Sequence, residues 1–290
     1  QFTHPEDAYL PLKTTGGLVP GKYEVQGNIS SQFITGLLFA LPLLNGDSVI
    51  EIIGTLESKG YVDLTLDILS KFGIEIINHE YTSFEIKGNQ SYHSYNYTVE
   101  GDYSQTAFFL IAGAMGADIQ LKGMNPISYQ GDKKIIEDIS SLNGNIQFDH
   151  ELLYCLPSQT KGTTIDFSQS PDLGPALTVL ASVSEGVSYF KHVSRLRIKE
   201  CDRVTCMKEE LEKLGAKIDE EPDTMKIYGT KKLHGGVVDS HNDHRVAMAL
   251  AMASLKMDED LTILNAECVS KSYPNFWEVF EALGGDVTYE

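Results

Sequence analysis

This chain repeats itself with a period of about 70 residues, which is typical of a protein built from copies of one structural unit. Four segments share the pattern of a helix end, a glycine and a β-strand. Their glycines, spaced by 71, 71 and 69 residues, are Gly73, Gly144, Gly215 and Gly284. A second series of turns before strands has spacings of 70, 70 and 71 residues, at Gly46, Gly116, Gly186 and Met257. Two series with one period predict four copies of one supersecondary unit.

The first copy shows the order of elements within a unit. It alternates between strand patterns and apolar or amphipathic helix patterns, which predicts β-α-β-α-β-β and an α/β fold. Its predicted elements are residues 22–27, 30–46, 48–54, 58–73, 74–80 and 83–89. The other copies are expected over residues 95–157, 163–229 and 237–290. Residues 9–17 resemble the last strand of a preceding copy, so we expect the sequence to start within a repeat.

Charge and composition exclude several classes of protein. The formal net charge is -18, which argues against a general nucleic-acid binder or a protein that binds anionic membranes. No apolar run approaches the roughly 18 residues of a membrane span. The first residues, QFTHPEDAY, do not resemble a secretory signal. The four cysteines have no CxxC or zinc spacing, so we expect free thiols and a cytoplasmic location.

Arginine is confined to one part of this acidic chain. The four arginines are Arg195, Arg197, Arg203 and Arg245. Guanidinium groups recognise carboxylates and phosphates through two parallel hydrogen bonds. Their clustering therefore favours local anion recognition, with surface salt bridging as the alternative.

Polar residues gather where helices are expected to begin. The first copy has Ser30, Ser31 and Gln32 before one helix, and Ser58 and Tyr61 at the start of the next. Helix N-termini offer free N–H groups and the positive end of a dipole, which suits a phosphate. Helix capping is the alternative for these hydroxyl groups, and for Ser58 taken alone it is the favoured one.

The third and fourth copies place charges at the corresponding positions. In the third copy, Ser170-Pro171-Asp172 has the composition of an ordinary capped helix start, and a second helix is expected to begin at Arg195. Cations at helix starts oppose the dipole unless an anion is bound. The cations concerned are Lys199, Arg203, Arg245 and Lys271. If the starts converge, these cations meet Asp172 and Glu200 in a site for an anionic substrate that undergoes proton transfer.

A metal site is not expected. His241 and His244 are three residues apart, but no third ligand has a recognisable spacing.

The motifs GNISSQF, RLRIKECDR, NDHR and SKSYP together resemble those of the 5-enolpyruvylshikimate-3-phosphate synthase family. The resemblance covers essentially the whole chain. It implies an inside-out α/β enolpyruvyl transferase fold of two domains with three β-α-β-α-β-β units each. Four of the six units are present, so about 140 N-terminal residues of a family member are absent. Residues 1–98 would then be part of the first domain, and 99–290 the second.

The resemblance also implies an activity and residue roles. The family transfers the enolpyruvyl group of phosphoenolpyruvate to the 5-hydroxyl of shikimate-3-phosphate and releases phosphate, without a metal or cofactor. Catalysis would fall to Asp172 and Glu200. Shikimate-3-phosphate would be bound by Ser30, Ser31, Gln32, Ser58, Tyr61, Asp172 and Lys199. Phosphoenolpyruvate would be bound by Gln32, Arg203, Arg245 and Lys271. The roles of Arg195 and His244 are left open.

Two alternatives remain beside this one. The sister enolpyruvyl transferase that acts on UDP-N-acetylglucosamine shares the fold, although the RIKE-x-DR pattern argues against it. A non-catalytic anion-binding protein derived from the same repeats is the other. We expect a monomer that is inactive or nearly so without the remaining units. We also expect the clustered cations to serve ligand binding and to contribute little to thermal stability.

Overall fold

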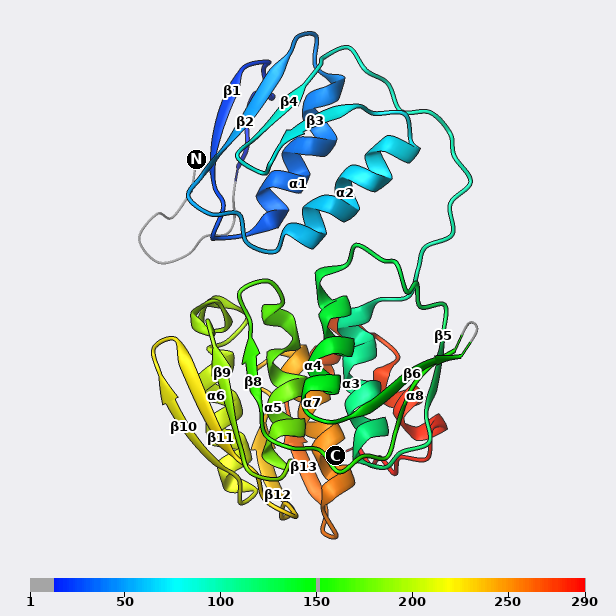
Figure 1. Ribbon diagram of the computed structural model, residues 1–290, viewed down its shortest axis with the longest axis vertical. Coiled ribbons are helices and arrows are strands. Elements are labelled where there is room, and N and C mark those ends of the chain that lie inside the picture. The colour runs from blue at the N-terminus through cyan, green and yellow to red at the C-terminus, as the bar shows by residue number, and fades with distance from the viewer. Residues whose placement is uncertain (1–12, 150–151, 290) are drawn as a thin grey trace. The chain divides into compact units, whose positions relative to one another are not determined.

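The computed structural model describes residues 13–149 and 152–289. It divides into two compact units, Gln1–Asn96 and Tyr97–Glu290, which are described separately (Figure 1). Each unit has its own hydrophobic core. No helix among the described residues is long and apolar enough to span a lipid bilayer. A mixed α/β fold, as the sequence predicted, is confirmed.

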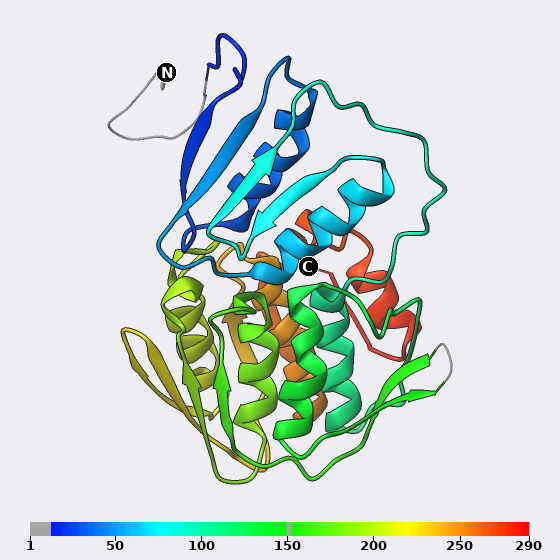
Figure 2. The same cartoon turned by 45° about the horizontal axis from the view of Figure 1, so that its top comes forward.

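The first unit contains one β-α-β-α-β-β arrangement. Its elements are β1 (Lys22–Gln26), α1 (Ser31–Ala40), η1 (Leu41–Leu43), β2 (Ser48–Ile53), α2 (Lys59–Lys71), β3 (Ile76–His79) and β4 (Ser83–Ile86). The sheet has the order β1-β2-β4-β3, with β1 and β2 parallel and the other pairs antiparallel. Helices α1 and α2 pack together against one face of this sheet and bury Ile34, Leu38 and Val62 (Figure 2).

The second unit contains three sheets and three central helices. The first sheet, β5-β7-β6, comprises β5 (Gln120–Lys122), β6 (Asn145–Asp149) and β7 (Leu152–Leu156). The second, β10-β11-β9-β8, comprises β8 (Thr164–Asp166), β9 (Val187–Lys191), β10 (Lys217–Glu221) and β11 (Thr224–Tyr228). The third pairs β12 (Gly236–Asp239) with β13 (Leu261–Leu264). The α-helices are α3 (Tyr103–Met115), α4 (Ile135–Ser141), α5 (Gly174–Ser182), α6 (Arg203–Lys213), α7 (His244–Ala253) and α8 (Phe276–Ala282).

The second sheet repeats the topology of the first unit. Strands β8 and β9 are parallel, β9 pairs antiparallel with β11, and β11 with β10. Order and directions therefore match those of β1, β2, β4 and β3. Short 3₁₀ helices lead into or follow the helices of this unit: η2 (Gly131–Lys134), η3 (Pro171–Leu173), η4 (Ser194–Ile198), η5 (Ser254–Lys256) and η6 (Ala266–Lys271).

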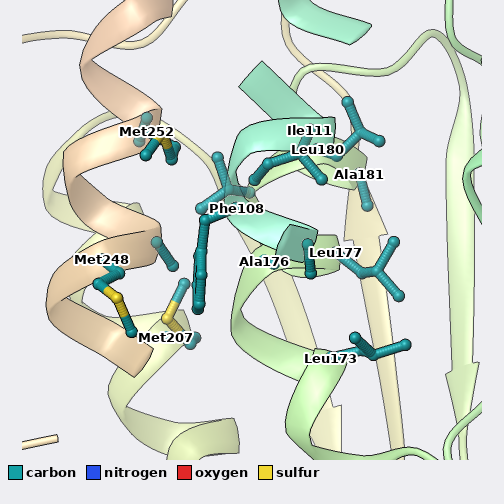
Figure 3. Close-up of a cluster of buried hydrophobic side chains, with 14 of the residues drawn as sticks. Phe108, Ile111, Leu173, Ala176, Leu177, Leu180, Ala181, Met207, Met248 and Met252 are labelled. Atoms are coloured by element: carbon teal, nitrogen blue, oxygen red, sulfur yellow. The ribbon is translucent and has the colours of Figure 1, made fainter. Parts of the chain in front are cut away.

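Three apolar helices form the core of the second unit. Every residue of α3, α5 and α7 is buried except Gln105 in α3. Figure 3 shows Phe108 of α3 reaching between Met248 of α7 and Ala176 of α5. A helix that is apolar on all sides is stable only when other elements cover it on all sides. The sheets and remaining helices provide this cover, so the helix N-termini have fixed positions relative to one another.

Three sequence predictions differ from the structure. The strand expected at the start of the second copy, near Tyr95, is absent, and residues 87–102 form neither helix nor strand. The strand expected after Gly284 is absent in the described residues, because no neighbouring strand pairs with residues 285–289. Of the strand expected over residues 9–17, residues 13–17 are irregular and the others lie outside the described residues.

Candidate active site

The parallel strand pairs of the second unit bring four loops to one place. Strands β8 and β9 end together, and the N–H of Phe167 donates to the carbonyl of Lys191 at 3.0 Å. Strands β12 and β13 also end together, and Ser240 donates to the carbonyl of Leu264 at 3.1 Å. The loops that follow the carboxyl ends of parallel strands are a common place for ligand sites in α/β proteins. These four loops, with the starts of α6 and α7 that follow two of them, carry all the charged residues that the sequence singled out in the third and fourth copies.

Arg203 is the centre of the resulting cluster. It is the first residue of α6, and its side chain is 1% exposed. Its Nε donates to Asp243 at 2.7 Å, its Nη1 to Asp172 at 2.8 Å and its Nη2 to Glu200 at 2.7 Å. Nη2 also donates to Asp243 Oδ1 at 3.3 Å, so the three guanidinium nitrogens together bond three carboxylates. Burial opposes the charge, but these carboxylates, led by Asp243, raise the pKa of Arg203.

Three further cations surround the two carboxylates that the sequence identified as catalytic candidates. Lys199 Nζ lies 3.2 Å from Asp172 Oδ1, and Arg245 Nη2 lies 3.5 Å from Asp172 Oδ2. Lys271 Nζ bonds Glu200 Oε1. The structure therefore brings together all six charged residues predicted for this part of the site. Counting Asp243, four cations face three carboxylates, which leaves the cluster one positive charge in excess.

The cations keep both candidate carboxylates ionised. Burial would raise the pKa of Asp172, but Arg245, Lys199 and Arg203 outweigh it and hold this pKa far below the ordinary value. Burial also opposes ionisation of Glu200, and the hydrogen bond from Lys271 with the charge of Arg203 lowers its pKa to about 2. An ionised Asp172 can accept a proton. Glu200 can deliver a proton only after its ion pairs with Arg203 and Lys271 have been weakened.

Several buried polar atoms at the cluster have no partner among the described residues. Arg245 is 9% exposed, and its Nη1 makes no hydrogen bond. His244 Nδ1 and the fully buried Ser170 Oγ are also unsatisfied. Burial and the adjacent Arg245 charge lower the pKa of His244 to about 4, so its ring is neutral at neutral pH. A buried polar group without a partner costs about 1–3 kcal/mol, which an incoming anion would offset at Arg245.

Asp243 is a site residue that the sequence analysis missed. It is the N-cap of α7, where its carboxylate accepts from the N–H of Arg245 at 2.8 Å, and it is fully buried. The same carboxylate holds Arg203, so one side chain fixes the start of α7 to the start of α6. An acidic residue directly before the first helical residue was visible in NDHR. Its second function, as a partner of Arg203, depends on the packing of two distant loops. No pattern in the sequence indicates this contact.

The structure corrects three local predictions about helix starts. Helix α6 begins at Arg203, whereas residues 194–198, where the helix was expected to begin, form η4. The start of α5 packs closely against η4, because a Cβ at Gly174 would approach Leu196 Cδ2 to 2.2 Å. Ser170 does not cap its helix. Ser58 makes no capping hydrogen bond either, because its backbone is left-handed, with a φ of 55°.

The remaining two arginines lie outside the cluster of six. Arg197 pairs with Asp202 and Glu220, both at 2.9 Å, and supports the loop before α6. Arg195 donates to the carbonyl of Ser168 at 3.3 Å. Surface or structural bonding, the alternative reading of the arginine clustering, therefore applies to Arg197.

The predicted residues of the first unit also lie at the carboxyl ends of two parallel strands. The N–H of Gly27 after β1 donates to Ile53 of β2 at 3.1 Å, and the N–H of Glu57 donates back to Gly27 at 3.0 Å. These bonds place the starts of α1 and α2 beside each other. Ser30 caps α1 by accepting from the N–H of Gln32 at 3.2 Å. The five predicted residues at these starts are Ser30, Ser31, Gln32, Ser58 and Tyr61.

Two other features lie apart from the cluster. Among the described residues, one group of possible metal ligands has its atoms within 4.8 Å of one another, namely Glu209, Glu210 and His241. Glu210 there is bonded to His241 at 2.8 Å and to Lys213 at 2.6 Å. A cavity of about 600 Å³ lies at the C-terminal ends of α3 and α5 and contains none of the predicted site residues.

Comparison with known proteins gives consistent results. The family model described as EPSP synthase (3-phosphoshikimate 1-carboxyvinyltransferase) matches residues 3–280. The chain is 51% identical over 286 residues to a 3-phosphoshikimate 1-carboxyvinyltransferase of Clostridium acetobutylicum, covering 99% of this chain and 66% of that protein. It is 52% identical over 281 residues to the one of Clostridium perfringens, covering 97% and 66%. The chain thus spans just under two thirds of the length of these relatives.

A solved structure shows the same fold. An EPSP synthase from Acinetobacter baumannii superposes with a TM-score of 0.76 at 25% sequence identity. The match covers 92% of this chain and 63% of the other.

Proposed function

The chain belongs to the EPSP synthase family, and from this premise we propose that it supplies active-site residues for the 3-phosphoshikimate 1-carboxyvinyltransferase reaction. The substrates are phosphoenolpyruvate and shikimate-3-phosphate. The enolpyruvyl group is transferred to the 5-hydroxyl, and phosphate is released. The observation that carries the proposal is the buried cluster in which Arg203 joins Asp172, Glu200 and Asp243 while Arg245 keeps an unsatisfied nitrogen.

The charges of the cluster suit phosphoenolpyruvate. This ligand carries a carboxylate and a phosphate, and the cluster has one positive charge in excess. Arg245 Nη1 is a free donor, and Lys271 is the most exposed of the four cations, with its side chain 56% exposed. Arg245 and Lys271 are therefore the residues most available to an incoming anion, with Gln32 as the proposed contribution of the first unit. Arg203 would contact the ligand by releasing one of its present carboxylate partners.

Ligand binding would also prepare the two carboxylates for proton transfer. An anion that takes hydrogen bonds from Lys271 and Arg203 removes the groups that depress the pKa of Glu200, so this pKa rises towards its ordinary value. Asp172 gains basicity in the same way when Arg245 turns to the ligand. The substrate itself thus converts a tightly ion-paired cluster into an acid and a base.

The proposed chemistry uses one proton at each carboxyl group. Glu200 delivers a proton to C3 of phosphoenolpyruvate while the 5-hydroxyl oxygen bonds to C2, and Asp172 takes the hydroxyl proton. The C2–O bond to phosphate then breaks, Glu200 takes a proton back from C3 as the double bond forms again, and the departing phosphate takes the hydroxyl proton from Asp172. Positioned acids and bases of this kind contribute about 10²–10⁴-fold each, and the cations stabilise the departing phosphate.

Shikimate-3-phosphate is proposed to bind through residues of both units. Ser30, Ser31 and Gln32 at the start of α1 offer hydroxyl and N–H donors to a phosphate. Ser58 and Tyr61 would add contacts from the start of α2. Lys199 and Asp172 would act from the second unit, since both lie at the cluster where the 5-hydroxyl must react.

We propose an inside-out arrangement of two domains with three units each, of which residues 1–98 supply part of the first and 99–290 the second. The matching topologies of the two four-stranded sheets support the repeated unit. The described cysteines are all free, which supports a reducing compartment such as the cytoplasm, and a monomer is proposed.

A chimera provides the direct test. This chain would replace the matching two thirds of the Clostridium acetobutylicum relative, and phosphate release would be measured with both substrates. Activity that is lost in Asp172→Asn but kept in a variant of a remote carboxylate, Asp67→Asn, would support the proposal. Binding of phosphoenolpyruvate without any turnover would favour the non-catalytic anion-binding alternative. Turnover with UDP-N-acetylglucosamine in place of shikimate-3-phosphate would identify the sister activity.

A further inference from the structure

Two cysteines flank the capping residue of the helix that carries Arg203. Asp202 is the N-cap of α6, where its carboxylate accepts from the N–H groups of Val204 and Thr205 at 3.1 and 3.2 Å. Cys201 therefore precedes the cap, and Cys206 is the fourth residue of the helix. Side chains at these two positions pack against each other across a capped helix start, usually as a pair of apolar residues. Here the pair consists of two thiols.

The two thiols are in contact in this structure. The two side chains are close enough for each thiol to shift the pKa of the other, and Cys201 Sγ lies 3.8 Å from Asp243 Oδ2. Cys201 is thus beside the same Asp243 that holds Arg203. Cys201 directly follows Glu200 in the chain, so the thiols are covalently and spatially adjacent to the cluster.

The two cysteines differ in exposure and in acidity. Cys206 is 7% exposed, whereas Cys201 is partly exposed and gives a small oxidant access to the pair. The neighbouring Cys201 side chain lowers the pKa of the Cys206 thiol and outweighs the effect of burial. Cys206, with burial and the Asp243 charge, raises the pKa of Cys201. A thiol with a lowered pKa beside a second thiol is the arrangement found in reversible redox pairs.

We propose that Cys201 and Cys206 form a redox-sensitive dithiol that a peroxide oxidises to a disulfide at the edge of the anion-binding cluster. The Cys206 thiolate attacks a peroxide oxygen, the O–O bond breaks, and a sulfenic acid and one water form. Cys201 then attacks the Cys206 sulfur, the S–O bond breaks, and a second water leaves. The two thiols lose two electrons and two protons, and the peroxide is reduced to water.

Closure of the disulfide changes the loop that carries Glu200. An S–S bond of about 2.05 Å is much shorter than the separation of two thiols that are not covalently joined. We therefore expect the Cys201 side chain to move towards α6 and away from Asp243, and the preceding residue, Glu200, to shift with it. We expect phosphoenolpyruvate affinity to fall by about tenfold, within the roughly 5–150-fold range common for coupled sites, and to recover on reduction. The expected loss of phosphoenolpyruvate affinity rests on the proposed function, whereas the disulfide itself does not.

Peptide mapping tests the disulfide directly. Trypsin cuts after Lys199, Arg203 and Lys208, so the two cysteines fall on separate peptides, 200–203 and 204–208. After treatment of the chain with hydrogen peroxide and alkylation, we expect these peptides to be joined, at a mass two hydrogens below their sum. Dithiothreitol should separate them again. Absence of the joined pair, or preferential linkage of either cysteine to Cys268, would overturn the proposal.

Matched variants and a binding measurement complete the experiment. Cys201→Ser and Cys206→Ser should each prevent the linkage, whereas Cys155→Ser, a change at a thiol in β7, should leave it intact. Calorimetric titration of phosphoenolpyruvate into the reduced, oxidised and re-reduced chain measures the coupling. A disulfide with unchanged affinity would overturn the effect on the site. A chain that never binds phosphoenolpyruvate would count against the proposed function, while the peptide map would still decide the disulfide.

Discussion

Replacement of Arg203 by methionine would leave three carboxylates without their common partner. Asp243 is fully buried, and Asp172 and Glu200 have side chains only 24% and 26% exposed. Removing one partner of a buried ion pair costs about 3–5 kcal/mol, because the remaining charge keeps its desolvation penalty. For a unit of this size each kcal/mol corresponds to roughly 2–4 °C. We therefore expect the melting temperature of the second unit to fall by about 6–20 °C.

This expectation reverses part of the sequence analysis. There, we expected the clustered cations to serve ligand binding and to contribute little to thermal stability. The structure shows an Arg203 whose three nitrogens all bond carboxylates. Lysine has one nitrogen and cannot reach three carboxylates held at these positions. Arg203→Lys should therefore lower the melting temperature as well, although less than Arg203→Met because a positive charge is kept.

Lys271→Met is the matched control for this measurement. It removes one positive charge from the same cluster, but Lys271 is 56% exposed and bonds Glu200 alone. Exposed pairs contribute only about 0–1 kcal/mol. Calorimetric melts of the native chain and the variants, without ligand, would decide the matter. An Arg203→Met chain that melts within about 2 °C of Lys271→Met would refute the reasoning that Arg203 holds the loops together.

Three further predictions concern the same site and the first unit. The pKa of Glu200 in the folded chain is about 2, below its ordinary value of 4.5. Its ion pairs therefore stabilise the chain at pH values above 4.5, and this stabilisation is lost as the pH falls from about 5 to about 2. In urea titrations, the stability of Glu200→Gln should fall less steeply with acid than that of the native chain. In the chimera, Arg245→Lys should raise the Michaelis constant for phosphoenolpyruvate and Lys199→Met that for shikimate-3-phosphate, and equal effects of both on both substrates would contradict the assignment. Ser30→Ala should cost about 1 kcal/mol of stability in the first unit by removing the cap of α1, and an unchanged denaturation midpoint would contradict the capping.

The parts of the fold that follow local rules could be predicted from the sequence. Arg245 was expected at the start of a helix, and it is the second residue of α7, which is buried throughout. The alternating pattern of the first copy predicted strands where β1 to β4 are found. The expected strands near Tyr95 and after Gly284 are absent, because a strand depends on a hydrogen-bonded neighbour that its own residues do not specify. The close approach of Leu196 in η4 to Gly174 likewise joins two segments whose own residues do not specify each other.

The candidate site, like the fold, could be predicted from the sequence only in part. The recurrence of cations at helix starts predicted that Lys199, Arg203, Arg245 and Lys271 would meet Asp172 and Glu200, and the second unit does bring them together. The partner of each cation could not be predicted, since Arg203 and Asp243 are 40 residues apart and meet only after α6 and α7 pack. The residue roles taken from the family resemblance stay predictions.

The placement of three apolar helices at the centre of the second unit has a consequence for synthesis of the chain. Helix α3 ends at Met115, whereas α7, which covers part of it, ends at Ala253. Ribosomes add about 5–20 residues per second, so the nascent chain carries an uncovered α3 for on the order of ten seconds. The core of the first unit, by contrast, is complete once Ile86 has emerged. Growing chains of the second unit should therefore depend on chaperones that shield apolar segments, and slower translation between α3 and α7 would lengthen the period in which aggregation competes with folding.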